Sequence, residues 1–250
     1  MTSPNTAFPA MSDDDYELFK QFRITAMGEA IRTLLEDPAT AGLTGSQIIR
    51  YGLHSLKHHR DNVRLAKRRK AAHLDTSTAC VENIHYDSNR DLDKATIDGL
   101  AQLDWVRHGT NVIVQAPCGV GKTYIVKALG LAACENGYDV RYYTHHGLIR
   151  AIEEVTDDTG AYYQLIDDLS TVDVLIIDDF ALGSYADAHT RAIADVLDRR
   201  ESSATVLASQ LQPQDWYRAF DNPGFSEAIL SRLLKHPIVV AINGTDRRRQ

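Results

Sequence analysis

The apolar positions in the first third of the chain recur three or four residues apart, which is typical of helices that bury one face. A first helical region is predicted to begin after Ser12, because a capping hydroxyl precedes acidic residues in the first turn. Asp37 and Pro38 are expected to end this region, since the residue before a proline disfavours helix. A second helix is predicted over 45–72, so we expect residues 13–74 to form a small all-helical domain.

Short apolar runs rich in β-branched residues dominate the rest of the chain. These runs lie at 111–116, 139–144, 173–178, 204–208 and 238–242. Helix-forming segments separate the runs, and each run is too apolar to expose a face, which indicates parallel strands covered on both sides. The sequence therefore predicts an α/β domain with a five-stranded parallel sheet over 75–250. The polar stretch 74–83 is the expected boundary, and 1–12 is expected to be a disordered lead.

A Gly-rich turn joins the first of these strands to a helix. Residues 116–123 read APCGVGKT, which follows the phosphate-loop pattern GxxxxGK[ST] except for Ala116, whose methyl group fits if φ stays negative. Backbone N–H groups of such a loop face phosphate, while Lys122 would reach the β- and γ-phosphates and Thr123 would hold Mg²⁺. A chance turn is the alternative, but strand, loop and helix follow in the required order. The expected nucleotide contacts are Pro117, Cys118, Gly119, Val120, Gly121, Lys122, Thr123 and Tyr124.

Two acids end the apolar run at 173–178 and follow it. Asp178 would lie at the carboxyl edge of the sheet, where a carboxylate can hold Mg²⁺ through water. Asp179 occupies the place where many ATPases carry a glutamate that orients the attacking water. Because aspartate is one methylene shorter, we expect slow hydrolysis. The alternative is that both acids only cap a strand.

Three further groups could complete a nucleotide site. Ser209 and Gln210 follow the run at 204–208, where they either contact the γ-phosphate or water, or form an ordinary strand exit. Arg232 lies on an otherwise apolar helix, either as a surface arginine or as a finger that reaches a neighbour's nucleotide. The final residues, GTDRRRQ, are either a solvated tail or contain a γ-phosphate sensor.

The net charge of −7 conceals a basic segment. Residues 50–70 hold eight lysines and arginines against a single acid, Asp61, although the chain as a whole is acidic. Such a segment favours non-specific contacts to the phosphates of duplex DNA, and a solvated helix face is the alternative. The expected DNA contacts are Lys57, Arg60, Arg64, Lys67, Arg68, Arg69 and Lys70.

Composition limits the cellular setting. The three cysteines form no CxxC pair, which argues against a disulfide framework or a zinc cluster and favours a reduced, cytoplasmic protein. No run of 18 apolar residues exists, so no membrane span is expected. The N-terminus lacks the basic start and the apolar block of a signal peptide.

Taken in order, these stretches resemble the IstB-type ATP-binding helper proteins of bacterial insertion sequences, AAA+ proteins related to the helicase loader DnaC. The resemblance runs from about residue 15 to the end and rests on LDWVRHGTNVIVQAPCGVGKT, VLIIDDF, ASQLQPQDW, AILSRLLKHPIVV and NGTDRRR. It implies a helical DNA-binding part followed by an AAA+ core that uses ATP and Mg²⁺. It also implies homo-oligomers on duplex DNA that share active sites between subunits and cooperate with the transposase of the same element.

The resemblance also implies roles for single residues. Lys122 and Thr123 match the phosphate and Mg²⁺ ligands, and Asp178 matches the Mg²⁺ acid. The other matches are Asp179 as catalytic acid, Gln210 as first sensor, Arg232 as arginine finger and Arg248 as second sensor. Ala116, Gln210 and Ala181 depart from the family's usual Gly, Asn and Gly, which bears on the hydrolysis rate more than on nucleotide binding.

Only eight residues follow the run at 238–242, which leaves no room for a separate helical lid and favours sites completed in trans by an arginine.

Other classes of protein share parts of this pattern. A DnaC-type helicase loader would share the same core. A metabolic kinase would need a mid-chain arginine cluster, and a GTPase would need the lysine that 243–246 lacks. A module in which ATP is only a switch is the remaining alternative.

Overall fold

The computed structural model describes residues 11–86 and 91–243. The chain forms two compact units, Met1–Leu65 and Ala66–Gln250, and the division falls inside the long helix α3 (Gly45–Ala71). Each unit has its own packing. No helix among the described residues combines the length and the apolar character that a membrane crossing requires.

The first unit is helical, as its sequence pattern predicts. It contains α1 (Asp13–Gln21), α2 (Thr25–Glu36), the short 3₁₀ turn η1 (Pro38–Thr40) and the first part of α3. The predicted start at Ser12 is confirmed, because its hydroxyl accepts a hydrogen bond from the Asp15 N–H while the Asp15 carboxylate accepts one from the Ser12 N–H. The chain changes direction between α1 and α2 at Arg23, which has a φ of 57°.

Two glycines set the close packing of these helices. A Cβ atom at Gly28 would lie 2.7 Å from the Phe19 ring, and one at Gly52 would lie 2.9 Å from Ile31. Larger residues would therefore push the helices apart. Outside these close approaches much apolar surface stays uncovered, since Phe22 at the end of α1 is 70% exposed and Leu53 on α3 is 53% exposed.

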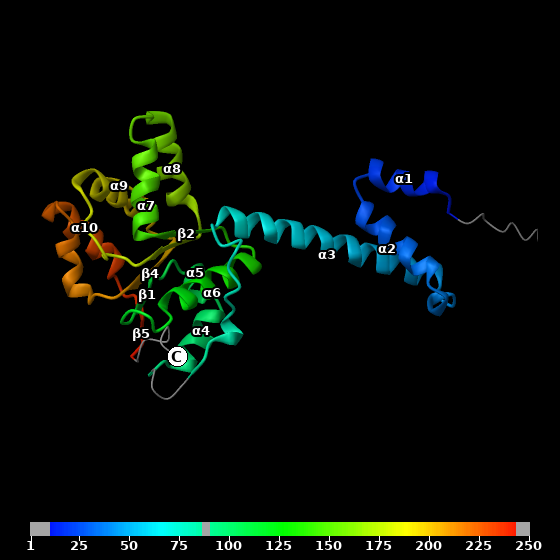
Figure 1. Cartoon of the computed structure of the whole chain (residues 1–250), viewed down its shortest axis with the longest axis horizontal. Helices are drawn as coiled ribbons and strands as arrows, with labels where there is room; N and C mark the ends of the chain where they lie inside the picture. The colour runs from blue at the N-terminus through cyan, green and yellow to red at the C-terminus, as the bar shows by residue number, and fades with distance from the viewer. Residues whose placement is uncertain (1–10, 87–90, 244–250) are drawn as a thin grey trace, which may run out of the picture. The chain divides into compact units, whose positions relative to one another are not determined.

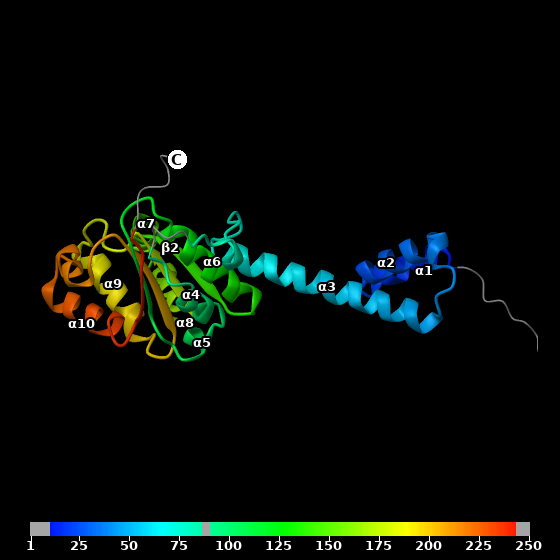
Figure 2. The same cartoon turned by 90° about the horizontal axis from the view of Figure 1, so that it is seen from below.

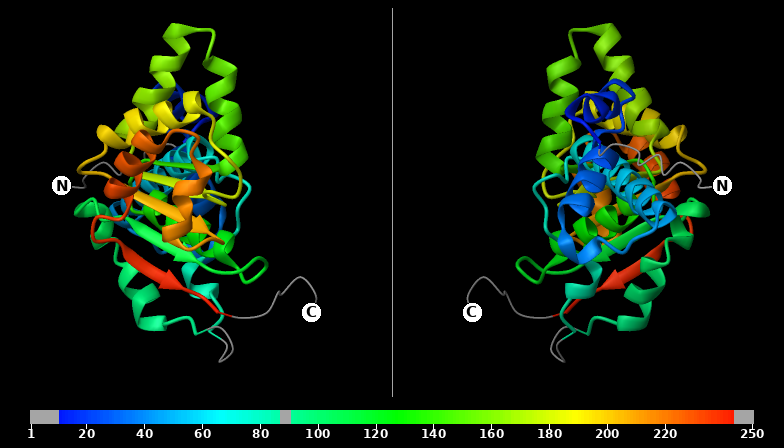
Figure 3. Two further views of the ribbon diagram at one scale, coloured as in Figure 1. Left: turned by 90° about the vertical axis from the view of Figure 1, so that its left-hand side faces the viewer. Right: turned by 90° about the vertical axis from the view of Figure 1, so that its right-hand side faces the viewer.

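The second unit is built on a five-stranded parallel sheet with the order β2-β3-β4-β1-β5. Figure 3 shows β5 at one edge of this sheet. The strands are β1 (Val112–Gln115), β2 (Val140–Thr144), β3 (Val174–Asp178), β4 (Ala204–Ser209) and β5 (Ile238–Ala241). All five predicted strands are confirmed, and β4 extends one residue beyond its predicted run.

Helices cover both faces of the sheet, which explains why every residue of the inner strands β3 and β4 is buried. One face packs against α6, and α4 lies beside α6 (Figure 1, Figure 2). The other face carries a core in which Ile113, Ile177 and Leu207 pack with residues of α7, α8, α9 and α10. The helices of this unit are α4 (Lys94–Ala101), α5 (Asp104–Arg107), α6 (Lys122–Glu135), α7 (His145–Val155), α8 (Thr159–Thr171), α9 (Asp187–Asp198) and α10 (Pro223–Leu233), with 3₁₀ turns η2 (Val81–Asn83) and η3 (Pro213–Ala219).

The parallel arrangement brings three chain segments to one edge of the sheet. The phosphate loop leaves the carboxyl end of β1, the paired acids end β3, and Gln210 follows β4. Because β1 lies beside β4 and β4 lies beside β3, these segments are neighbours in space although they are far apart in sequence. Any ligand held at this edge would meet all three.

Candidate functional site

The loop at 116–121 has the backbone that a phosphate cradle requires. Gly119 and Gly121 have φ values of 80° and 103°, a left-handed conformation that glycine adopts at little cost. α6 begins directly after Gly121, so its free N–H groups point toward the loop. Ala116 does not have a positive φ, and its N–H donates to the Ser209 carbonyl at 3.2 Å, so the methyl group is accommodated there.

Lys122 crosses the mouth of this loop. Its side chain is only 5% exposed, and its Nζ donates to the Pro117 carbonyl oxygen at 2.9 Å. This bond holds the ammonium group against the backbone of the loop. A cation beside several N–H donors makes this an anion-binding position, with phosphate as the group that fits best.

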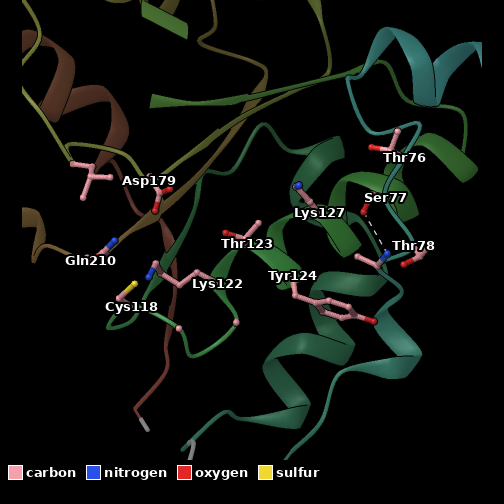
Figure 4. A pocket seen from close by; sticks show the side chains of 14 residues that line it. Thr76, Ser77, Thr78, Cys118, Lys122, Thr123, Tyr124, Lys127, Asp179 and Gln210 are labelled. Atoms are coloured by element: carbon pink, nitrogen blue, oxygen red, sulfur yellow. Dashed lines mark hydrogen bonds between the residues drawn. The ribbon is translucent and has the colours of Figure 1, made fainter. Parts of the chain in front are cut away.

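A cavity of about 660 Å³ opens beside the loop. This volume falls within the range of about 300–1,000 Å³ that is common for small-molecule sites. In Figure 4, Cys118, Lys122, Asp179 and Gln210 lie together on one side, with Tyr124 and Ser77 across the cavity. The lining residues are Thr76, Ser77, Thr78, Ala79, Cys118, Gly119, Gly121, Lys122, Thr123, Tyr124, Lys127, Asp179, Leu182 and Gln210.

The cavity brings together most of the residues that the sequence singled out. Thr123 and Tyr124 of α6 lie beside Lys122, while Asp179 and Gln210 come from the ends of β3 and β4. Two of the predicted loop contacts do not line the cavity. Pro117 contributes its carbonyl to Lys122, and the side chain of Val120 is buried in the protein.

Asp178 lies behind Asp179 and is 1% exposed. One carboxylate oxygen accepts a hydrogen bond from the Tyr142 hydroxyl at 2.9 Å, and the other accepts one from the Asp179 N–H at 2.9 Å. Asp179 has a φ of 53° and Ala181 a φ of 61°. The turn after β3 is therefore strained at two non-glycine positions. One of them, Ala181, is a position named above as a departure from glycine.

Ser209 and Gln210 have different positions. The Ser209 side chain is fully buried, donates to the Phe180 carbonyl at 2.8 Å and accepts from the Trp216 ring N–H at 3.0 Å. The suggestion that Ser209 contacts the nucleotide is therefore wrong, because its hydroxyl is used to join β4 to the turn after β3. Gln210 is the member of the pair that lines the cavity.

Arg232 does not reach this cavity. Its guanidinium forms an ion pair with Asp198 and donates to the Ala228 carbonyl at 2.9 Å. It lines a smaller cavity of about 120 Å³ that also contains Asn111, the residue before β1. Arg232 thus lies at the amino edge of the sheet, opposite the phosphate loop of its own chain. Arg248, the expected second sensor, lies outside the described residues.

The basic side chains of α3 fall into two groups. Lys57, Arg60, Arg64, Lys67 and Lys70 are exposed. Arg68 and Arg69 are half-buried and have partners within the second unit: Arg68 lies 3.9 Å from the Asp139 carboxylate, and Arg69 donates to the Ser77 carbonyl at 3.1 Å. The seven DNA contacts stay a prediction, but the Arg69 guanidinium is already bonded to the segment that lines the cavity.

Sequence reasoning missed one wall of the site. The stretch 76–79, expected to be part of a linker, lines the cavity opposite the phosphate loop. Tyr124 fixes this wall to α6, because its hydroxyl accepts from the Cys80 N–H at 3.2 Å and donates to the Cys80 carbonyl at 3.3 Å. No pattern marks this pairing, which joins residues 44 positions apart.

The chain is similar to known proteins in sequence and in fold. The model of the family described as IstB-like ATP binding protein matches residues 17–250. The ATP-binding protein of insertion sequence IS1162 from Pseudomonas fluorescens is 33% identical over 192 residues, covering 76% of this chain and 83% of that protein. The insertion sequence ATP-binding protein y4uH from Sinorhizobium fredii is 27% identical over 233 residues, 93% of each chain. The crystal structure of the DnaC helicase loader superposes with a TM-score of 0.54 at 17% identity, over 67% of this chain and 98% of that one.

The sheet order, the phosphate loop and the paired acids define an ATP-binding P-loop protein with an AAA+ core. The chain belongs to the IstB-like ATP-binding protein family, whose model spans most of its length. The expected fold class and the family resemblance are both confirmed.

Proposed function

We propose that this protein is a slow ATPase that assembles on duplex DNA with little sequence preference and assists the transposase of an insertion sequence. The observation that carries this proposal is the cavity at the carboxyl edge of the sheet, where Lys122, Asp179 and Gln210 converge. The names of two relatives, both insertion sequence ATP-binding proteins, support the link to transposition.

The residues of the site fit ATP with Mg²⁺. The Thr123 side chain is exposed in the cavity, and the carboxylate oxygens of Asp178 are oriented by one donor each. An oxygen-rich pair of this kind suits Mg²⁺, which would be held by Thr123 and, through water, by Asp178. The ion would supply charge compensation for the phosphates.

The remaining groups divide the chemistry between them. Lys122 binds phosphate, and Gln210 contacts the terminal phosphate or the water beside it. Asp179 accepts a hydrogen bond from the attacking water and orients it, with a side chain shorter than the glutamate of many ATPases. Because the position of a water-orienting group strongly affects rate, a short acid favours slow turnover.

The site needs a further cation to complete it. Among the described residues, no arginine lines the cavity. Arg232 lies at the opposite edge of the sheet, away from the cavity of its own chain, which supports oligomers in which it contacts a neighbour's nucleotide. ATP would then stabilise the interface between subunits, and hydrolysis would reset it.

DNA binding is assigned to the exposed basic side chains of α3. A run of lysines and arginines neutralises backbone phosphates without contacting base edges. A helicase loader of the DnaC type is the second candidate. A test for association with transposase or with a replicative helicase distinguishes the two.

The direct test of the site is Lys122→Ala in the full chain. We expect the variant to fold, because Lys122 bonds within the loop, but to lose most of its affinity for a fluorescent ATP analogue. Lys127→Ala, which removes a second amine that lines the cavity, is the matched control and should weaken binding less. Equal ATP affinity in Lys122→Ala and in the parent would overturn the proposed site.

A further inference from the structure

Tyr142 lies on the edge strand β2, and its hydroxyl contacts the buried Asp178, the residue before the cavity-lining Asp179. This hydroxyl donates to Asp178 Oδ2 at 2.9 Å, and the two side chains are 8% and 1% exposed. The Asp179 N–H donates to the other carboxylate oxygen. The hydroxyl and this N–H together fix the rotation of the Asp178 carboxylate.

We propose that Tyr142 is a positioning residue, whose hydroxyl holds the Asp178 carboxylate in the orientation that binds Mg²⁺ through water. This inference rests on the proposed nucleotide function. Groups that hydrogen-bond to a metal-binding carboxylate restrict its orientation, and their loss typically weakens metal binding by about 10- to 100-fold.

The tyrosine itself is held on several sides. Its N–H donates to the Ala72 carbonyl at 3.0 Å, and a ring nitrogen of His73 lies 3.3 Å from the Tyr142 carbonyl oxygen. These bonds occupy the free side of β2. The Lys127 ammonium lies 4.8 Å from the centre of the Tyr142 ring, and Lys127 also lines the nucleotide cavity. A fixed tyrosine can orient a carboxylate, whereas a mobile one cannot.

The Tyr142 hydroxyl is the donor in this bond, and the Asp178 carboxylate is the acceptor. A hydrogen bond from a neutral hydroxyl to a buried carboxylate is charge-assisted and stronger than one between neutral groups. The bond therefore opposes rotation of Asp178 when the metal is absent.

The test is Tyr142→Phe in the full chain, which removes one hydroxyl and keeps the ring. Binding of a fluorescent ATP analogue is titrated with Mg²⁺ and, separately, measured in EDTA. We expect the affinity for the analogue in EDTA to be unchanged. The Mg²⁺ concentration that gives half of the maximal increase in analogue binding should rise by about tenfold or more. Thermal unfolding verifies that the variant is folded. Tyr143→Phe removes the hydroxyl of the next residue and should keep the parent's Mg²⁺ dependence.

A second measurement separates positioning from a general effect on the fold. In an Asp178→Asn background, Tyr142→Phe should no longer change the Mg²⁺ dependence, because the group it orients is already altered. An unchanged Mg²⁺ requirement in Tyr142→Phe, or equal effects of Tyr142→Phe in both backgrounds, would overturn the positioning role. If the parent itself shows no Mg²⁺-dependent nucleotide binding, the proposed function fails, and this inference fails with it.

Discussion

At the residue scale, the turn after β3 shows how backbone and chemistry are linked. Asp179 adopts a left-handed conformation that places its carboxylate in the nucleotide cavity, directly after the buried Asp178. Aspartate and asparagine tolerate this conformation better than most residues. An aspartate in this position thus combines the proposed catalytic carboxylate with a backbone conformation that the turn requires.

The role of Asp179 is tested by Asp179→Asn, which keeps both the shape and the backbone tolerance. We expect ATP affinity to be unchanged and single-turnover hydrolysis to fall by about 100-fold or more, as is common when a catalytic acid or base is removed. ATP-bound oligomers should accumulate as a result. Hydrolysis at the parent rate would show that another group orients the water.

His145 gives the second unit a predicted pH dependence. Its ring is 1% exposed, and burial lowers its pKa to about 4, with the neighbouring His146 and His189 acting in the same direction. The imidazole of the unfolded chain binds a proton below about pH 6.5, whereas that of the folded chain stays neutral down to about pH 4. The free energy of unfolding therefore has its full value above pH 6.5 and decreases as the pH falls toward 4.

The expected loss from His145 alone is about 2 kcal/mol in the free energy of unfolding at about pH 5. It is measured by urea unfolding at neutral and acidic pH, with fluorescence of the two buried tryptophans, Trp105 and Trp216, as the signal. In His145→Gln, the free energy of unfolding should differ less between neutral and acidic pH than it does in the parent. An equal pH dependence in the variant and the parent would exclude His145 as its source.

At the element scale, the helix α3 carries the proposed DNA-binding side chains. Changing the exposed Lys57, Arg60, Arg64 and Lys67 to Ala should weaken binding to duplex DNA. The affinity should also fall less steeply with salt: the slope of log affinity against log salt should become less negative by roughly 0.9 for each DNA phosphate that the variant no longer neutralises. Arg69 is left intact because its bond to Ser77 supports the cavity wall.

The matched control removes four exposed basic side chains elsewhere, which leaves the net charge change identical. These are Lys20, Arg107, Arg191 and Arg218. The control should retain most of the affinity and the salt slope. If both variants lose affinity equally, the effect comes from net charge, and α3 is not a specific DNA-binding element.

The strands could be predicted from the sequence, whereas the hydrogen bonds between distant side chains could not. The inner strands β3 and β4 were predictable because every residue in them is buried, which requires an apolar run, and parallel pairing brings the carboxyl ends of the strands to one edge. The hydrogen bonds of Tyr124 with Cys80 and of Tyr142 with Asp178 were not, because they join residues 44 and 36 positions apart without any periodic signal. Arg69 was assigned to DNA for the same reason, since its charge is visible in the sequence and its partner is not.

At the scale of the whole molecule, no arginine among the described residues lines the cavity proposed for ATP. The nucleotide cavity lies at the carboxyl edge of the sheet, and Arg232 lies at the amino edge. We propose that a neighbouring copy brings its Arg232 to this cavity, so that ATP stabilises the interface between copies. Several aligned basic helices would bind DNA far more tightly than one, through their raised effective concentration.

The most direct test is sedimentation velocity of the full chain with a duplex DNA fragment and Mg²⁺, in ATP and in ADP. We predict fast-sedimenting complexes of several subunits with ATP, and mainly free DNA and small complexes with ADP at the same protein concentration. Identical sedimentation in the two nucleotides would contradict the claim that ATP controls assembly on DNA.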